Sequence, residues 1–347
     1  MNDKVRWGVL GVARIAVEKV IPAMQAGTNC EVIAIASRDL SKAKQAADRL
    51  SIPRAYGSYE ALLADREIEA IYNPLPNHMH VPWSIRAAEA GKHVLCEKPI
   101  GLNVEEARGL LKVRDRTGLK IQEAFMVRTH PQWIRTHELV AQGRIGTLRS
   151  MTGYFSYFNR DPANIRNIPA YGGGALMDIG CYLVHTSRFI FGRKPSRVSA
   201  VIDRDPEMGT DRLTSFVMDF SATDSKRLSG LLPEWGHSIG TCSTQASPYQ
   251  RVQVAGTEGR IEIEIPFNAP PDRPCRIFVD DGTSLSGNGI EVEEFPVCDQ
   301  YTIQGELFSL AIRGKAEQAL PLEDSIENMA VIDGIFRSAE TNTWEMP

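Results

Sequence analysis

Short apolar strands alternate with helical segments through the first 125 residues, and this alternation restricts the possible folds more than any other feature of the sequence. The predicted strands cover residues 5–10, 31–36, 70–72 and 93–96, and the predicted helices cover residues 15–26, 40–50, 81–90 and 104–117. Strands separated by helices in this way form βαβ units, whose strands lie parallel in one sheet. We therefore predict an α/β domain over residues 1–125.

From about residue 126 the pattern changes to strand-like runs separated by Gly, Pro, Asp and Asn turns. These runs begin at residue 148 and continue at 196–200, 213–220, 228–232, 251–255, 260–265 and 276–279. Because few helices lie between them, the strands are expected to pair mainly antiparallel. One helix is expected to end near Gln142, and a last helix to run from about Leu322 to Thr341. Residues 126–347 are thus predicted to form an α+β domain with an open, mostly antiparallel sheet.

The composition is that of an ordinary globular protein, with 43% hydrophobic and 24% charged residues. A net charge of −4 provides no basic face for nucleic acid or an anionic membrane surface. No apolar run reaches the roughly 20 residues that span a bilayer, and the N-terminus lacks the pattern of a secretory signal. The six scattered cysteines include no CxxC pair, which favours reduced thiols over disulfides or a zinc site. We expect a cytoplasmic protein with no bound metal.

The turn between the first strand and the first helix carries a variant of the G-x-G-x-x-G fingerprint, with Gly11, Ala13 and Ala16 at its three small positions. The glycine allows a tight turn, and the small residues let backbone N–H groups and the helix N-terminus approach a pyrophosphate. A tight turn without a ligand is the alternative, but the position at the first strand–helix junction favours a dinucleotide site. The expected cofactor contacts in this loop are Gly11, Ala13, Arg14 and Ile15.

The end of the second strand bears on the choice between NAD and NADP. An enzyme specific for NAD usually has an acidic residue there to bind the ribose 2′-hydroxyl, whereas this strand ends in Ser37 and Arg38. Both side chains suit a 2′-phosphate. Asp39 comes one residue later and is equally suited to cap the next helix. The sequence therefore favours NADP, with NAD as the alternative.

Four motifs, in the same order along the chain, resemble those of the glucose–fructose oxidoreductase / inositol dehydrogenase (Gfo/Idh/MocA) family. They lie at residues 74–80, 91–99, 123–128 and 172–182, and the second ends in the hallmark Glu97-Lys98-Pro99. The resemblance implies an NAD(P)-dependent oxidoreductase of sugars, cyclitols or related alcohols, forming dimers or tetramers. Residues 1–125 would then bind the dinucleotide, and residues 126–347 would bind substrate and mediate oligomerisation. The resemblance places Glu97 and Pro99 beside the nicotinamide, and Leu75, Asn77 and His80 beside the cofactor.

Lys98 follows the carboxyl end of a predicted strand, which is the edge where ligands bind in open α/β sheets. From there its ammonium group could donate to a substrate oxygen and stabilise a developing alkoxide. A surface lysine with its charged end in solvent is the usual alternative for an isolated Lys. The position and the resemblance together favour a catalytic role. Whether the bond to Pro99 is cis is left open.

Asp178 and Tyr182 lie four residues apart on a helix that follows the glycine run 172–174, so they share one face. Many family members have a histidine at the position of Tyr182. The tyrosine resembles the glucose–fructose oxidoreductase, xylose dehydrogenase and dihydrodiol dehydrogenase branch, in which it is the proton carrier. The ammonium of Lys98 and the cationic nicotinamide would favour its phenolate. A buried tyrosine bonded to Asp178 is the alternative.

Three further residues are candidates for binding substrate. His185 follows Tyr182 by three positions, although a packed core histidine fits equally well. Arg128 and Arg166 could donate to substrate hydroxyls, but Arg166 could also form a surface ion pair. His78 and His80 have no carboxylate or thiol at a spacing that would complete a metal site.

The residues together predict a sugar or polyol dehydrogenase in which Lys98 and Tyr182 act on the reacting hydroxyl and Asp178 orients the substrate. One alternative is an oxidoreductase of dihydrodiols or other non-sugar carbonyls. Another is a catalytically inactive sugar sensor that keeps its cofactor. A homodimer or homotetramer is expected, because a large open sheet needs its second face covered.

Overall fold

The computed structural model describes residues 3–221 and 235–347, so the strand predicted at 228–232 lies outside the described residues. The chain divides into two compact units. Unit 1 comprises residues 1–129 and 299–326, and unit 2 comprises residues 130–298 and 327–347. The predicted boundary at 125/126 therefore differs in two respects: the first crossing comes after Thr129, and a late segment returns to unit 1.

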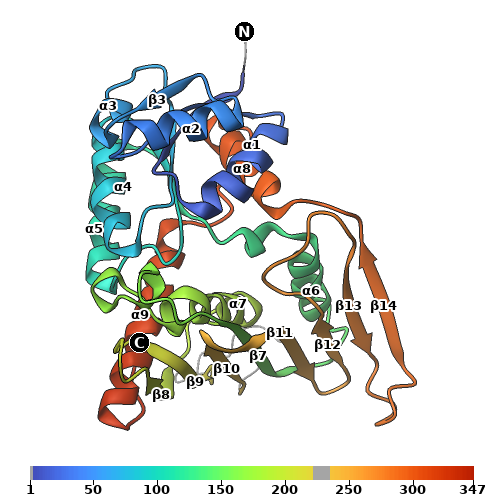
Figure 1. The fold of residues 1–347 in the computed structure, drawn as a ribbon. Coiled ribbons are helices and arrows are strands. Elements are labelled where there is room, and N and C mark those ends of the chain that lie inside the picture. Colours follow the sequence, from blue (N-terminus) through green and yellow to red (C-terminus); the bar gives the residue numbers. More distant parts are fainter. Residues whose placement is uncertain (1–2, 222–234) are drawn as a thin grey trace. The chain divides into compact units, whose positions relative to one another are not determined.

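Unit 1 is built on a parallel sheet, as predicted (Figure 1). In the described residues the strand order is β3-β2-β1-β4-β5-β6, and every pairing between neighbours is parallel. The strands are β1 (Val5–Leu10), β2 (Cys30–Ala36), β3 (Arg54–Tyr56), β4 (Ala70–Asn73), β5 (His93–Cys96) and β6 (Ile121–Glu123). Order reverses beside β1, so the carboxyl ends of β1 and β4 flank the switch point at which such sheets bind ligands.

The helices of unit 1 are α1 (Ile21–Ala26), α2 (Leu40–Leu50), α3 (Tyr59–Leu63), α4 (His80–Glu89), α5 (Val104–Thr117) and α8 (Gln300–Ile312), with 3₁₀ turns at Asn77–Met79 and Met126–Thr129. Four of them, α1, α2, α4 and α5, correspond to predicted ranges, whereas α3 and α8 were not predicted. One difference lies before α1. Residues Ala16–Val20 form a π-helical turn, a feature that often occurs at functional sites.

Helix α8 was not predicted from the sequence, and it completes the core of unit 1. Its Phe308 is fully buried and packs against Trp7 of β1, with the ring centroids 5.8 Å apart. The indole N–H of Trp7 donates to the hydroxyl of Ser309 at 3.1 Å. The parallel sheet is thus covered by a helix encoded far from the rest of its unit.

Unit 2 is built on a larger sheet with the strand order β14-β13-β12-β11-β7-β10-β9-β8 among the described residues. Its pairings are antiparallel except for that of β7 with β10, which is parallel. The strands are β7 (Leu148–Phe158), β8 (Arg197–Arg204), β9 (Asp211–Asp219), β10 (His237–Ser243), β11 (Gln245–Gly256), β12 (Arg260–Ile263), β13 (Cys275–Asp280) and β14 (Ile290–Phe295). The prediction of a mostly antiparallel α+β domain is confirmed.

Helices of unit 2 cover one face of this sheet (Figure 1). They are α6 (Pro131–Ala141), α7 (Cys181–Phe191) and the part of α9 (Leu322–Thr341) that belongs to unit 2; short 3₁₀ turns lie at Ile165–Asn167 and Pro169–Tyr171. A Cβ at Gly153 would lie 2.5 Å from Leu183, so the glycine allows α7 to approach β7 closely. Side chains on the other face are exposed, among them Val201 (75%) and Ile239 (40%).

All six cysteines are free, and all but Cys298 are buried. None of the helices in the described part of the chain is long and apolar enough to cross a membrane.

Candidate active site

The glycine loop after β1 has the geometry that its sequence predicts. Gly11 has φ +85°, and a Cβ there would lie 3.1 Å from Leu75. Its N–H donates to the carbonyl of Ala36 at 2.8 Å, which fixes the turn against β2. Ala13 and Ile15 follow at the start of the first helix, whose leading N–H groups have no acceptor within the helix. The exposed Arg14 forms an ion pair with Glu18 at 2.8 Å.

The residues after β2 comprise one helix cap, Asp39, and the two side chains that precede it, Ser37 and Arg38. Asp39 is the N-cap of α2 and accepts from the N–H groups of Ser41 and Lys42, and the hydrogen bond from Ser41 lowers the pKa of its carboxyl. Ser37 is buried, and its hydroxyl accepts from the N–H of Asp39 at 3.2 Å. Arg38 is exposed and interacts with the hydroxyl of Tyr59, which partly offsets the rise that burial causes in the pKa of Tyr59.

The segment Glu97-Lys98-Pro99 follows β5 directly, and the bond between Lys98 and Pro99 is cis. Two buried groups fix the backbone around it. His80 has Nδ1 2.7 Å from the carbonyl of Pro99 and Nε2 2.6 Å from that of Leu75. Glu123, only 1% exposed, accepts from the N–H of Ile100 at 2.8 Å. Lys98 itself is partly exposed. The buried side chains of His80 and Glu123 fix the backbone that follows it.

His80 was predicted to lie beside the cofactor, and in the structure both of its ring nitrogens face backbone carbonyls. Burial lowers the pKa of His80 to about 4, while the carbonyls of Pro99 and Leu75 oppose that shift. The ring joins the loop after β4 to the loop after β5. It therefore positions the Lys98 segment, and its contact with a cofactor stays a prediction.

Glu97 is held by a tyrosine that the sequence did not point to. The hydroxyl of Tyr72, in β4, donates to Oε1 of Glu97 at 2.7 Å. Burial raises the pKa of Tyr301 in α8, and the charge of Glu97 raises the pKa of Tyr301 further. Two other residues predicted in this half lie in short turns. Asn77 is partly exposed in the turn before α4, and Arg128 lies in the 3₁₀ turn that ends the first segment of unit 1.

These residues of unit 1 fit a nicotinamide dinucleotide. Gly11 turns the chain with a positive φ that other residues rarely adopt, and the N-terminus of a helix follows it. The pyrophosphate would lie on the residues from Gly11 to Ile15, and the nicotinamide would lie near Glu97 and Pro99.

In unit 2, the glycine run 172–174 forms the entry to a second helix. Gly172 has φ +75° and Gly174 has φ +123°, and a Cβ at Gly173 would lie 2.5 Å from the carbonyl oxygen of Arg166. A Cβ at Gly174 would overlap Oδ1 of Asp211. Asp211 is 1% exposed and accepts from the N–H of Leu176 at 2.7 Å, so it caps the helix that begins there. Burial raises the pKa of Asp211 to about 6.

Asp178 lies in the π-helical segment Leu176–Gly180 and contacts two polar side chains. The hydroxyl of Tyr157, near the end of β7, donates to its Oδ2 at 2.6 Å. The guanidinium of Arg166 lies 3.0 Å from its Oδ1. Burial, followed by the charge of Asp178, raises the pKa of Tyr157, so that hydroxyl stays protonated and donates. The predicted substrate residue Arg166 is thus an ion-pair partner of Asp178.

Tyr182 lies in the first turn of α7 and is 6% exposed. Its ring packs against Phe155 and Phe267, with centroid distances of 6.0 and 5.6 Å. This apolar contact fixes the ring. His185, one turn later, is 1% exposed and lies in the interior of unit 2.

Besides Tyr72, three polar residues that support the site were not predicted. Glu123 appeared in a family motif without a role, while Tyr157 and Asp211 were not singled out. Asp211 and Leu176 are 35 residues apart in the chain, and Tyr157 and Asp178 are 21 apart. No local spacing signals such pairs, because they depend on how the strands pair.

Comparisons with known proteins agree with this arrangement. The family model for an oxidoreductase family with an NAD-binding Rossmann fold matches residues 5–125, and that for the GFO/IDH/MocA C-terminal domain matches residues 133–262. The chain is 48% identical to an uncharacterised oxidoreductase of Rhizobium meliloti, over 99% of each chain. It is 39% identical to D-xylose 1-dehydrogenase (NADP(+)) 2 of Haloferax volcanii, over 96% of this chain and 97% of that protein.

Among solved structures, the 3-ketoreductase KijD10 of Actinomadura kijaniata, in complex with NADP and TDP-benzene, superimposes with a TM-score of 0.86. The two chains are 27% identical, and the match covers 96% of this chain and 98% of that one. The likeness spans both units and both family domains. The chain therefore belongs to the Gfo/Idh/MocA family of oxidoreductases, with an NAD-binding Rossmann domain followed by the C-terminal domain of that family.

Proposed function

We propose that this protein is an NADP-dependent dehydrogenase that oxidises a hydroxyl group of a sugar or sugar-like polyol. The observation that carries the proposal is the placement of Lys98 directly after β5, on a backbone segment fixed by His80 and Glu123. The 39% sequence identity to a D-xylose 1-dehydrogenase, over 96% of this chain, supports a sugar as substrate. A dinucleotide held by unit 1 would supply the hydride acceptor.

Lys98 and Tyr182 are the proposed catalytic residues. The Lys98 ammonium would donate to the reacting oxygen and stabilise negative charge on it. The Tyr182 phenol would carry the proton, and the ammonium of Lys98 would lower the pKa of that phenol towards neutrality. The carboxylate of Asp178, one helical turn away, would oppose that effect. Because Arg166 lies 3.0 Å from Asp178, the charge of that carboxylate is largely balanced. Asp178 would orient substrate hydroxyls.

A preference for NADP is supported by the residues after β2. Asp39 is engaged by the backbone of α2, so the carboxylate that would serve an NAD ribose is already used as a helix cap. Ser37 and Arg38 precede it and suit a phosphate. The names of the Haloferax volcanii relative and of the KijD10 complex, both of which include NADP, point the same way.

A homodimer or homotetramer is also proposed. The face of the unit 2 sheet opposite α7 exposes Val201 on β8 and Ile239 on β10. Apolar side chains on an uncovered sheet face favour burial against a second copy. The free state of all six cysteines supports a reducing compartment such as the cytoplasm.

The deciding experiment is a panel of aldoses, polyols and aromatic dihydrodiols assayed with NADP and with NAD, following the absorbance of the reduced nicotinamide in both directions. Turnover of an aldose or polyol with NADP is the expected result. Turnover of aromatic diols alone would replace the proposed substrate class. Tight NADPH binding without turnover of any compound would instead indicate a sensor.

A further inference from the structure

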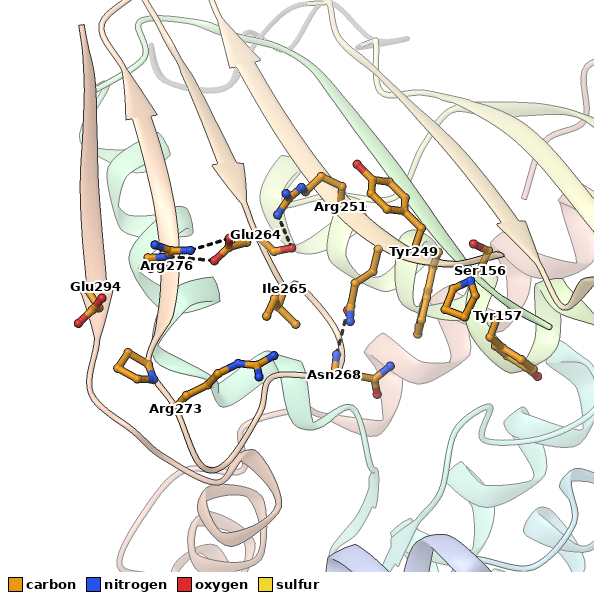
Figure 2. Close-up of a pocket in the computed structure, with 14 residues that line it drawn as sticks. Ser156, Tyr157, Tyr249, Arg251, Glu264, Ile265, Asn268, Arg273, Arg276 and Glu294 are labelled. Carbon is orange, nitrogen blue, oxygen red and sulfur yellow. Dashed lines mark hydrogen bonds and ion pairs between the residues drawn. The ribbon is translucent and has the colours of Figure 1, made fainter. Parts of the chain in front are cut away.

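Charged side chains line a cavity of about 850 Å³ in unit 2, and they lie on the sheet face that is proposed to contact a second copy (Figure 2). Arg251 pairs with Tyr154 in the strand register, so its side chain lies on the face opposite that of Phe155. Phe155 packs against Tyr182. Arg276 lies on the same face as Arg251. The sheet therefore separates these charges from Tyr182, whereas a charge that can act on a bound cofactor follows β5 in unit 1.

That charge is the carboxylate of Glu97, which lies at the edge of unit 1 where the dinucleotide is proposed to bind. Glu97 follows β5 directly, and its side chain is partly exposed. The hydroxyl of Tyr72 donates to its Oε1 at 2.7 Å, and Tyr72 itself is fully buried in β4. A hydrogen bond donated to a carboxylate stabilises its ionised form. The carboxylate is thus anchored from the interior while its residue stays partly exposed at the carboxyl edge of the sheet.

One apolar cluster connects Glu97 with the loop that would hold the pyrophosphate. Tyr72 belongs to this buried cluster, and Ala13 and Ile15 at the start of the first helix pack against it. Tyr301 of α8 also packs against it, and the charge of Glu97 reaches the Tyr301 hydroxyl. Glu97 therefore lies on the side of the sheet that is covered by the first helix, whose N-terminus would bind the pyrophosphate.

The two redox states of the cofactor differ in charge beside this carboxylate. The oxidised nicotinamide ring carries a positive charge, whereas the reduced ring is neutral. A fixed carboxylate attracts the cationic ring and has no net charge to attract in the reduced one. Lys98 has the opposite charge and acts in the opposite direction, so the wild-type preference is the sum of the two effects. Neutralising Glu97 alone isolates the part that its carboxylate contributes.

We propose that Glu97, held in place by Tyr72, selects the oxidised dinucleotide over the reduced one. The inference rests on the proposed function, which places the nicotinamide beside Glu97. A dehydrogenase that oxidises its substrate has to bind NADP⁺ in competition with NADPH, and this carboxylate favours the form that the reaction consumes. The effect lies in binding, since a charge that stabilises the oxidised ring also opposes its reduction. Tyr72 acts through Glu97 and is thereby a positioning residue.

Calorimetric titration with three probes in the absence of substrate tests the proposal. The probes are NADP⁺, NADPH and 2′-phospho-ADP-ribose, which lacks the nicotinamide. Glu97→Gln is expected to raise the Kd for NADP⁺ by roughly tenfold and to change the other two values by less than about twofold. Equal weakening of all three probes would indicate a contact with a part that they share, such as a ribose, and would overturn the proposal. An unchanged ratio of the Kd values for NADPH and NADP⁺ would also overturn it.

Tyr72→Phe tests the positioning role, because it removes the hydroxyl and keeps the buried ring. It should raise the Kd for NADP⁺ by roughly threefold and leave that for NADPH unchanged. In the Glu97→Gln background it should have no further effect on the ratio, since Tyr72 acts through the carboxylate. The matched control is Tyr56→Phe, whose hydroxyl donates to Asp65 at 2.8 Å, and it should leave the ratio unchanged. A lower melting temperature for Tyr72→Phe with an unchanged ratio would show a structural role alone and refute the positioning role.

The two proposals fail in different ways. Oxidation of a sugar with NADP⁺ by the wild type, together with a Kd ratio that survives Glu97→Gln, would refute the selection by Glu97 and leave the dehydrogenase standing. A Kd ratio that falls in Glu97→Gln, together with no turnover of any sugar by the wild type, would refute the dehydrogenase and leave the selection by Glu97 standing.

Discussion

Asp211 occupies the space that a side chain at position 174 would need, and its carboxylate caps the helix on which Asp178 and Tyr182 lie. The strand that carries Asp211 and the glycine that precedes the helix therefore depend on each other. Because Gly174 also has φ +123°, two independent constraints require glycine at this position.

Replacing this glycine should destabilise the protein. Gly174→Ala is expected to lower the free energy of unfolding by at least about 2 kcal/mol, since it combines backbone strain with an overlap at a buried cap. The matched control is Gly109→Ala in α5, where a Cβ meets nothing within 4 Å and φ is not positive. That control should stabilise by about 0.5–1 kcal/mol. Thermal unfolding checks both, and equal melting temperatures for the two variants would contradict the assignment.

Loss of either proposed catalytic side chain should reduce turnover and spare cofactor binding. Lys98→Met and Tyr182→Phe are each expected to lower kcat by about 100-fold or more, the usual effect of removing an electrostatic or acid–base group. The Kd for NADPH, followed by tryptophan fluorescence, should change by less than about threefold. Lys112→Met, on the exposed side of α5, is the control and should retain full activity. Near wild-type kcat in both catalytic variants would mean that other residues carry the reaction.

Tyr157 should act through Asp178 as a positioning residue. Tyr157→Phe removes the 2.6 Å hydrogen bond and is expected to lower kcat/KM by roughly 10-fold, mainly through KM, because hydrogen bonds to charged groups contribute about 1.5–3 kcal/mol. Tyr154→Phe, whose ring contacts Tyr249, is the control. A purely structural role for Tyr157 would lower the melting temperature and leave KM unchanged.

Cofactor preference should depend on Arg38. Arg38→Gln is expected to reduce the ratio of NADP to NAD affinity by roughly tenfold, through loss of a charge-assisted contact with the 2′-phosphate. Asp39→Ala should instead cost about 1 kcal/mol of stability and leave that ratio unchanged, because Asp39 caps α2. Fluorescence titration with both cofactors measures the ratio. A wild type that binds NAD more tightly would refute the preference.

Acid should destabilise the protein between about pH 6.5 and pH 4. Burial lowers the pKa values of His80, His93 and His130 to about 4 each. In this window the unfolded chain binds more protons at these histidines, so stability falls as the pH falls. Asp211 has the opposite sign, because its folded pKa of about 6 exceeds the value of 3.8 for an unperturbed aspartate. Three histidines outweigh one aspartate, and a melting temperature at pH 5 equal to that at pH 7 would contradict this balance.

Periodicity in the sequence predicted the parallel sheet, most of its helices and the antiparallel second sheet. It did not reveal α8, whose buried positions include Gln300, Gln304, Gly305 and Ser309. Polar residues and a glycine interrupt the buried face on which Phe308 and Ala311 lie, so the helix has no continuous apolar stripe to detect. A Cβ at Gly305 would lie 3.1 Å from Met24, so the helix approaches α1 closely at this position.

Local geometry was predictable where it follows a local motif, as for the tight turn at Gly11 and the place of Lys98 after β5. The groups that hold those residues were not, because Glu123 and Asp211 act through contacts fixed by strand order. Arg166 shows the same limit: its sequence suited a substrate ligand or an ion pair, and only the fold shows that Asp178 lies 3.0 Å away.

The late position of α8 determines when unit 1 can mature during synthesis. Residues 1–129 leave the ribosome first, but the contacts of Trp7 with Phe308 and Ser309 cannot form until those residues have been translated. Nascent chains that end before α8 therefore lack part of the cover of this sheet. The nucleotide-binding unit begins first and is finished nearly last.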